Sequence, residues 1–273
     1  YGTKLGYVSK SVKSLMGIEN TAFLAEEIED KTPAQVSGQI LSYMLSKAKG
    51  RLMEEELTDV IITVPASFDS DQCQATLDAA KLAGINVDNT HDILLYEPKA
   101  VIYDFVNMQE MGEIPEGLLS FDRPQNILVF DLGGGTLDVT IHRVGYNSEN
   151  MMNIEDLAIS RYTKIGGDNF DELLAENMLA RFQEQNSIKV PEKRKEEVMC
   201  KLRKLAERLK VDISSDYKMA KDMNRPLPEG YFMEAISMNI FDSYSYADEF
   251  TPEELLKIVD PLMGNNLSLQ DVK

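Results

Sequence analysis

The residues best suited to chemistry lie in one stretch, ILVFDLGGGTLDVTIHRV, at residues 127–144. It consists of two apolar runs joined by a turn, and the turn residues are Gly133, Gly134, Gly135 and Thr136. Many hairpins manage with one glycine. Three in a row remove every side chain from that part of the turn, so backbone N–H groups can approach a ligand closely. Phosphate oxygens are the usual ligands of such turns.

Carboxylates flank the turn on both sides, Asp131 before it and Asp138 after it. Asp131 ends a run expected to be a buried strand, where a carboxylate is costly unless a cation such as hydrated Mg²⁺ faces it. The Thr136 hydroxyl can bond a phosphate or a water. These residues predict a turn that binds phosphate and magnesium, with Asp138 ranked below Asp131 because it can simply end the turn. The alternative is an ordinary glycine-rich hairpin with solvated aspartates, since a short motif alone does not distinguish a ligand-binding turn from a structural one. The chain has no GxxxxGKS loop and no GxGxxG that opens a helix.

Strands and helices must position this turn, and the chain before it alternates between them. DVIITVP, at residues 59–65, predicts a buried strand. Ser70 is expected to cap a helix over roughly 71–83 that Gly84 ends. A second strand, ILLY, leads into EPKAVIYDFV, where Pro98 suits a first helical turn with Glu97 at its start. This alternating order predicts an α/β fold.

After the turn, apolar spacings of three and four predict two adjacent helices, followed by a strand and a last helix. The expected elements are a strand at 154–165, a helix from Asp168, a helix at 191–210, a strand at 231–241, and a helix capped by Thr251 that ends at Gly264.

Composition narrows the function classes. The chain has 273 residues and 43% apolar content, enough for one large or two modest domains. Its formal charge of −18 disfavours binding to nucleic acid or to an anionic membrane through long-range electrostatic attraction, because these partners are also negatively charged. Cys73 and Cys200 make no disulfide framework and fit a reducing compartment. The only histidines are His91 and His142, which disfavours a His-based metal site or a Ser-His-Asp triad. The chain begins at Tyr1 without a signal-like segment, so its true N-terminus is expected to be absent.

The motifs resemble those of one family. VFDLGGGTLDVTI resembles the second phosphate loop of the seventy-kilodalton heat-shock chaperones (DnaK-type), which belong to the actin and sugar-kinase superfamily. Further motifs match that family in its order, and they are TVPASFDSDQCQATLDAAKLAGINV, LLYEPKAVIYDF, KIGGDNFDELL and KLRKLAERLKVDISS. Near the start, SVKSLMG is similar to the segment with the family's catalytic lysine. The resemblance spans almost the whole chain.

This resemblance implies an α/β, actin-like or ribonuclease H-like ATPase domain of two lobes, here incomplete at both ends, with ATP or ADP and Mg²⁺ between the lobes. Residues 1–126 would form the remainder of the first lobe, including its helical and strand subdomain and the connecting helix. Residues 127–273 would form the second lobe, with a smaller α/β subdomain at about 168–255.

The resemblance also implies roles for single residues. Asp131 would hold Mg²⁺ through water, Glu97 would order the metal's waters and the attacking water, and Lys13 would stabilise charge on the transferred phosphoryl group. Thr136 would contact the γ-phosphate region, and catalysis would consist of positioning and electrostatics. The expected nucleotide contacts are Gly133, Gly134, Gly135, Gly166, Gly167, Glu207, Lys210 and Ser214.

Each assignment has an ordinary structural alternative. Lys13 can be a solvated lysine, and Glu97 can be a first-turn carboxylate favoured by the helix dipole. Glu207 and Lys210 have the spacing of a common surface pair on a charged helix.

The chain also departs from the family pattern. Val211 stands where the family usually has an arginine that stacks on adenine, and it offers no cation–π interaction. Ser67 replaces an aromatic residue, and Lys99 replaces a small polar one. The family's first phosphate loop and its glycine-rich adenosine loop are not found in the sequence. If the chain ends as given, poor nucleotide binding and little turnover are expected.

The function implied is ATP binding and hydrolysis in a chaperone that assists protein folding in the cytoplasm. Its partners would be unfolded polypeptides bound through a C-terminal domain, a J-domain co-chaperone and a nucleotide exchange factor, with no nucleic acid and no membrane. Two alternatives stay open. An actin-like, filament-forming ATPase is disfavoured by KLRKLAERLKVDISS, and a degenerate, non-hydrolysing regulatory relative is favoured by Val211.

Overall fold

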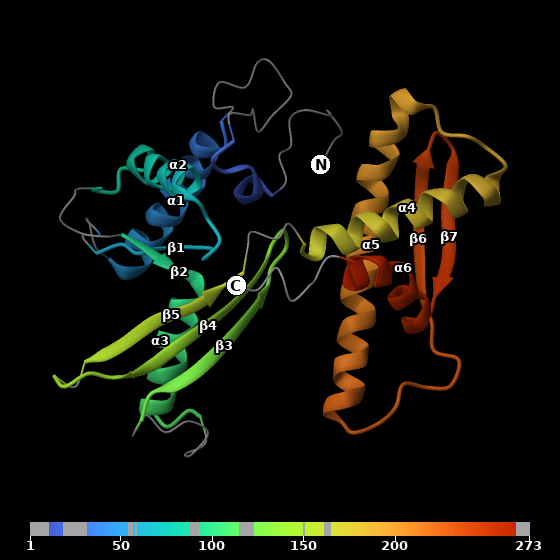
Figure 1. The fold of residues 1–273 in the computed structure, drawn as a ribbon. Coiled ribbons are helices and arrows are strands. Elements are labelled where there is room, and N and C mark those ends of the chain that lie inside the picture. The colour runs from blue at the N-terminus through green and yellow to red at the C-terminus, as the bar shows by residue number, and fades with distance from the viewer. Residues whose placement is uncertain are drawn as a thin grey trace. The chain divides into compact units, whose positions relative to one another are not determined.

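The computed structural model describes residues 11–18, 32–53, 57, 59–87, 93–114, 123–149, 151–160 and 165–265. They fall into two compact units, one containing the described residues up to 160 and the other residues 165–265 (Figure 1). Both units contain helices and strands, so the mixed α/β class predicted from the sequence is confirmed. A search of these described ranges finds no helix that is both long and apolar enough to cross a membrane.

The first unit begins with helices that the sequence analysis did not assign. The 3-10 helix η1 spans Val12–Leu15, and α1 spans Pro33–Leu52 and packs on α2, Ser70–Leu82. Gly38 allows this packing, because a Cβ at that position would lie 2.9 Å from Cβ of Leu82. The small residue that brings the helices together also interrupts the apolar periodicity of α1, which is why the sequence pattern gave no signal there.

The entry to α2 differs from the prediction. Asp69 and not Ser70 is the cap, since its backbone is extended and its carboxylate accepts a hydrogen bond from the Gln72 amide at 2.9 Å. The Gln72 side chain in turn accepts from the Asp69 amide, which completes a capping box. Gly84 ends the helix with a φ of +82°, as predicted.

The first sheet of this unit is small. β1 is Ile62–Val64 and pairs in parallel with β2, Leu94–Tyr96. The strand expected over residues 59–65 is therefore shorter than predicted, and it is not fully buried, because Ile61 is 60% exposed. Partner strands on both sides would be needed to bury such a run, and the described residues supply one.

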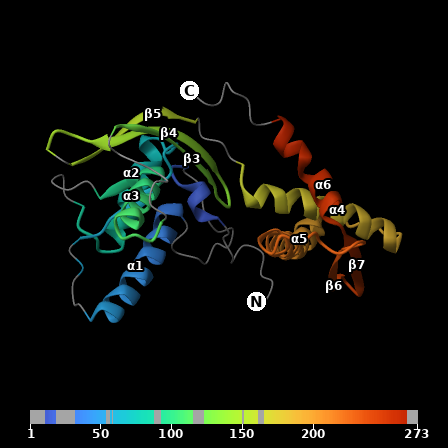
Figure 2. The same ribbon diagram turned by 90° about the horizontal axis from the view of Figure 1, so that it is seen from below.

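The second sheet carries the glycine turn. β3, Gln125–Leu132, and β4, Leu137–Tyr146, form the predicted hairpin, and β5, Met152–Ile159, adds a third antiparallel strand. α3, Glu97–Glu110, lies against one face of this sheet (Figures 1 and 2). Apolar side chains fill the space between helix and sheet, and they are Ile102, Val106, Val129 and Val144. The helix with Glu97 at its start is thereby fixed to the strands that flank the turn.

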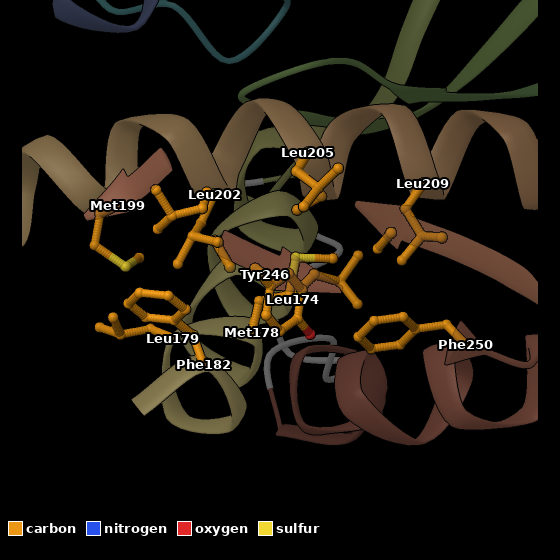
Figure 3. Close-up of a cluster of buried hydrophobic side chains, with 14 of the residues drawn as sticks. Leu174, Met178, Leu179, Phe182, Met199, Leu202, Leu205, Leu209, Tyr246 and Phe250 are labelled. Carbon is orange, nitrogen blue, oxygen red and sulfur yellow. The ribbon is translucent and has the colours of Figure 1, made fainter. Parts of the chain in front are cut away.

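The second unit is built around two long helices. α4 spans Gly167–Asn186 and α5 spans Glu192–Asp222, with the hairpin of β6, Met233–Phe241, and β7, Tyr244–Phe250, beside them. The side chains drawn in Figure 3 belong to their common core, and the labelled ones are Leu174, Met178, Leu179, Phe182, Met199, Leu202, Leu205, Leu209, Tyr246 and Phe250. This core holds the part of α5 that carries the expected nucleotide contacts.

In this unit two elements, α5 and β7, differ from the prediction, and α6 agrees with it. α5 continues past Lys210 because no proline or glycine follows until Pro226. β7 was not predicted at all. α6, Pro252–Asn265, begins as expected with Thr251 as cap and ends next to Gly264, within the usual uncertainty of a helix end.

The compact units divide between residues 160 and 165, whereas the lobes expected from the family resemblance divide at residues 126 and 127. β3, β4 and β5 belong to the same unit as α3 because they share its core. The predicted strand at 154–165 begins earlier, at Met152, and residues 161–164 lie outside the described part. The assignment of residues to family lobes remains a proposal.

Candidate functional site

The glycine turn is tight and clear of side chains. Its ends are joined by a hydrogen bond from the Gly133 amide to the Thr136 carbonyl at 2.8 Å. None of its three glycines has a positive φ, so backbone conformation does not demand glycine there. A Cβ on Gly135 would lie 2.5 Å from the Ser14 Oγ, whereas a Cβ on Gly134 would meet nothing within 4 Å. Close approach to η1 explains the glycine at position 135, whereas neither packing nor φ requires a glycine at position 134.

Two predicted catalytic residues, far apart in the sequence, meet beside this turn. Lys13 Nζ lies 2.5 Å from Glu97 Oε1, and the Glu97 side chain is 21% exposed. Glu97 is the first residue of α3, where the helix dipole favours a carboxylate and where Pro98 fits without loss of a hydrogen bond. Lys13 is the second residue of η1, the same short helix whose Ser14 lies against the turn. η1 therefore brings the lysine to both the carboxylate and the glycines.

The two aspartates that flank the turn stand directly opposite each other, because Asp131 pairs with Asp138 in the hairpin register. Asp138 is 3% exposed, and its Oδ1 has no hydrogen-bond partner among the described residues. Burial raises the pKa of Asp138, and the Asp131 carboxylate raises it further. Ser67 and the charge of Lys13 offset part of this rise in pKa, although the Ser67 hydroxyl itself makes no hydrogen bond among the described residues.

Asp138 is thus a stronger candidate than its sequence ranking suggested. A buried carboxylate with an unpartnered oxygen is unfavourable by itself and is expected where a ligand will satisfy it. The signal available in the sequence was the hairpin register, which pairs the second residue after the four-residue turn with the second residue before it. That signal locates the pair but does not predict which of the two aspartates is buried.

The residues around the turn fit a hydrated magnesium ion beside phosphate. Carboxylate oxygens are the ligands that Mg²⁺ prefers, and the unpartnered oxygen of Asp138 lies next to Asp131. In the described ranges, no group of three or more His, Cys, Asp or Glu residues is arranged to hold a metal ion directly. A cation that keeps much of its water shell would suit these carboxylates, and the water-mediated role of Asp131 stays a prediction.

The second group of predicted residues lies in the other unit. Gly166 caps α4, and its amide donates to the Asn169 side chain at 2.9 Å. Lys210 of α5 donates to the Gly167 carbonyl at 3.0 Å and pairs with Asp171 at 2.7 Å. Lys210 therefore fixes α5 to the glycine pair at the start of α4, a more specific role than that of a solvated surface lysine.

A pocket of about 540 Å³ opens beside Lys210. Ser214 and Val211 line it together with apolar residues of α4 and α6, which are Phe170, Leu255, Leu256 and Val259. The structure thus brings Lys210 and Ser214 to one apolar pocket, with Val211 at its wall. Glu207 is exposed and is not among the lining residues.

The predicted site residues consequently form two groups. Lys13, Glu97 and the turn residues converge within the first unit, whereas Gly166, Gly167, Glu207, Lys210 and Ser214 belong to the second unit. The nucleotide roles expected of the two groups stay predictions.

Comparison with known proteins gives the family. The family model described as Hsp70 protein matches residues 7–237. Chaperone protein DnaK of Mycoplasma mycoides subsp. mycoides SC is 33% identical over 266 residues, which cover 97% of this chain and 39% of that protein. The chain therefore spans well under half the length of this relative. Both findings agree with the motifs quoted from the sequence. The chain belongs to the Hsp70 protein family.

Proposed function

We propose that this chain is the Mg²⁺-dependent, ATP-binding and ATP-hydrolysing part of a chaperone, with the actin-like, ribonuclease H-like two-lobed architecture. The observation that carries this proposal is the convergence of Lys13, Glu97 and the glycine turn in one unit. Membership of the Hsp70 family supports it, because the relative from Mycoplasma mycoides is named as a chaperone protein.

The turn residues would bind the phosphates. The backbone amide of Gly134 is clear of side chains and can donate to a phosphate oxygen, whereas the Gly133 amide is bonded to the Thr136 carbonyl. The Thr136 hydroxyl can add a further bond. Asp131 and Asp138 would accept hydrogen bonds from the waters around Mg²⁺. A bound Mg²⁺ would supply charge neutralisation at the phosphate oxygens.

Lys13 and Glu97 would perform the two remaining tasks. When phosphate arrives, the Lys13 ammonium can exchange its carboxylate partner for the phosphoryl oxygens, where negative charge develops in the transition state. Glu97 is then released to accept a hydrogen bond from the attacking water and to orient it. Two groups that neutralise each other before binding would thus both become available to the substrate.

The pocket beside Lys210 would hold the adenosine. Its apolar wall suits a planar base, and the hydroxyl of Ser214 can bond the base edge. Glu207 and Lys210 would contact the ribose, and Gly166 and Gly167 would pass close to the nucleotide. Val211 can pack on the base but contributes no cation–π interaction.

In the whole protein, the nucleotide state would control a peptide-binding domain through closure of the lobes. Unfolded polypeptides, a J-domain co-chaperone and a nucleotide exchange factor would be the partners. The cytoplasm is the proposed location, on the basis of the family and the sparse cysteines.

Hydrolysis of Mg·ATP by the natural full-length protein tests this proposal. Lys13→Met should lower turnover about 100-fold or more, because it removes a charge that stabilises the transition state. Lys47→Met is the control, since Lys47 is an exposed lysine of α1 that stacks on Tyr43. Equal turnover in the wild type and in Lys13→Met would overturn the proposed mechanism.

A non-hydrolysing regulatory relative is the second candidate, and Val211 is the observation that favours it. Such a protein would bind nucleotide or a partner without turnover. Saturable binding of Mg·ATP with no release of phosphate over many hours would favour this reading.

A further inference from the structure

A chain of polar contacts lies on the inner face of the sheet and has no part in the site described above. Lys99 Nζ of α3 lies 3.0 Å from Asp156 Oδ2 of β5. The other carboxylate oxygen, Oδ1, lies 2.9 Å from Nδ1 of His142 on β4. The opposite ring nitrogen of His142 is 2.7 Å from the Thr140 Oγ1. Four side chains from three elements are thereby joined in one network.

The sheet holds its part of this network rigidly. His142 is 1% exposed, and Thr140 is completely buried. A register shift between Ile141 and His142 places Asp156 directly opposite His142. Bulges of this kind redirect a side chain and often occur next to functional sites. Asp156 is therefore a fixed anchor and not a freely moving surface carboxylate.

Lys99 occupies an electrostatically unfavourable position. It is the third residue of α3, in the first helical turn, where the helix dipole disfavours a cation. Two contacts compensate for this, the Asp156 carboxylate and the ring of Tyr96, whose centroid is 5.9 Å from Lys99 Nζ. Tyr96 and Lys99 stand on either side of Glu97 and Pro98, so these contacts bracket the start of the helix.

The far end of α3 has its own polar anchor. The Tyr146 hydroxyl at the end of β4 donates to Glu110 Oε1 at 2.9 Å. Between the two anchors the helix meets the sheet through the apolar side chains of Ile102 and Val106. Apolar contacts are non-directional and allow small shifts, whereas the ion pair at the first turn and the hydrogen bond to a carboxylate at the last turn fix the position of the helix along the sheet.

We propose that Lys99 is a positioning residue for Glu97. Asp156, which His142 holds in place, is the fixed partner of Lys99 on the sheet. The pair between Lys99 and Asp156 holds the first turn of α3 so that Glu97 meets Lys13 beside the glycine turn. This inference rests on the proposed hydrolytic function, in which displacement of a reacting group by about 1 Å can cost 100-fold in rate.

Single-turnover hydrolysis in the natural full-length protein tests the effect on the reaction. Lys99→Met should lower the rate of hydrolysis about 10- to 100-fold while the affinity for Mg·ATP changes less than about twofold. Lys99→Arg keeps the ion pair and should retain most of the rate. Tyr146→Phe removes the anchor at the other end of the same helix and should leave the rate within about twofold of the wild type. Equal losses in Lys99→Met and Tyr146→Phe would overturn the proposal, because they would indicate general loosening of α3.

Hydrogen–deuterium exchange on the 273-residue chain tests the positioning without any need for hydrolysis. Lys99→Met should speed exchange in the first half of α3 and leave its last turn unchanged, and Tyr146→Phe should do the reverse. If the wild type does not hydrolyse ATP, the proposed function fails, but this pattern still decides whether Lys99 holds the start of the helix. Exchange that is unchanged, or that rises evenly along α3 in Lys99→Met, would overturn the positioning role.

Discussion

Lys13 Nζ lies 2.5 Å from Glu97 Oε1, although 84 positions separate the two residues in the chain. The lysine side chain is 57% exposed, so the pair contributes little to stability and is open to exchange with a ligand. A weak ion pair in this place is suited to function, because each side chain can leave its partner and contact the substrate with little loss of free energy. The predictions below follow from this arrangement and from the turn beside it.

Replacement of Glu97 by glutamine should separate binding from hydrolysis. Glu97→Gln removes the carboxylate that orients the attacking water, so single-turnover hydrolysis in the full-length protein should fall about 100-fold or more. Mg·ATP affinity should change far less. The matched control is Glu110→Gln at the other end of α3, which should leave hydrolysis nearly unchanged. Full activity of Glu97→Gln would remove this residue from the mechanism.

Gly134 should be required for binding but not for folding. A Cβ there meets nothing within 4 Å, and the φ of Gly134 is not positive, so Gly134→Ala should change the free energy of unfolding by less than about 1 kcal/mol. The added methyl group occupies space proposed for phosphate and should weaken Mg·ATP binding about tenfold or more. Calorimetric titration and denaturant unfolding measure the two effects. Unchanged affinity would show that phosphate does not approach this glycine.

Gly135 should be required for the contact with η1. A Cβ there would lie 2.5 Å from the Ser14 Oγ, so Gly135→Ala should destabilise the chain by about 1 kcal/mol. The double variant Gly135→Ala with Ser14→Ala removes the obstructing oxygen and should recover most of this loss in denaturant unfolding. Failure to recover would mean that η1 does not pack on the turn in this way.

Asp138 should destabilise the fold when it is ionised and no nucleotide is bound. Its pKa is raised above the usual 3.8, chiefly by burial, so the native state holds this proton more tightly than the unfolded state. Its contribution to stability therefore falls as pH rises above the unfolded value. Asp138→Asn should raise the free energy of unfolding at pH 7 by about 1–3 kcal/mol, and the gain should shrink as the pH approaches 4.

The same substitution should weaken Mg·ATP binding, because a neutral amide cannot replace the carboxylate beside the cation. Urea unfolding at several pH values checks the first effect, and calorimetry checks the second. A variant that is less stable than the wild type at pH 7 would show that the Asp138 carboxylate is well satisfied in the fold.

Val211→Arg should strengthen binding of the adenosine. Val211 lines the apolar pocket and is half exposed, so an arginine has room to lie over the base. The cation–π interaction should lower the dissociation constant for ADP by a few-fold, on the order of 0.5–1 kcal/mol. Lys218→Arg changes a lysine at the same pocket and is the control. Weaker binding by Val211→Arg would argue against an adenine site at this pocket.

Local sequence patterns predicted the parts of the fold that local interactions determine. The hairpin around the glycine turn and α3 with Glu97 at its start were correct, because β-branched runs and Pro98 define them without help from distant residues. α1 was missed because its packing depends on Gly38, whose role is visible only when Leu82 lies beside it. Asp69 was overlooked as a cap because Ser70, an equally good cap, follows it.

Tertiary relations in the site were beyond the reach of sequence patterns. The resemblance assigned Lys13 and Glu97 to one reaction, but only the fold brings the two within hydrogen-bond distance. The burial of Asp138 and the contact between Lys99 and Asp156 depend on which face of each strand meets α3. A bulge in β5 places Asp156 opposite His142, and no local propensity predicts it.

Calorimetric titration of the natural full-length protein with Mg·ATP, in parallel with the 273-residue chain, tests the central claim most directly. The account predicts that the full-length protein binds one nucleotide per chain and that Gly134→Ala weakens this binding. Weak or absent binding by the 273-residue chain alone would mean that further contacts lie outside it. The absence of saturable binding by the full-length protein would contradict the account.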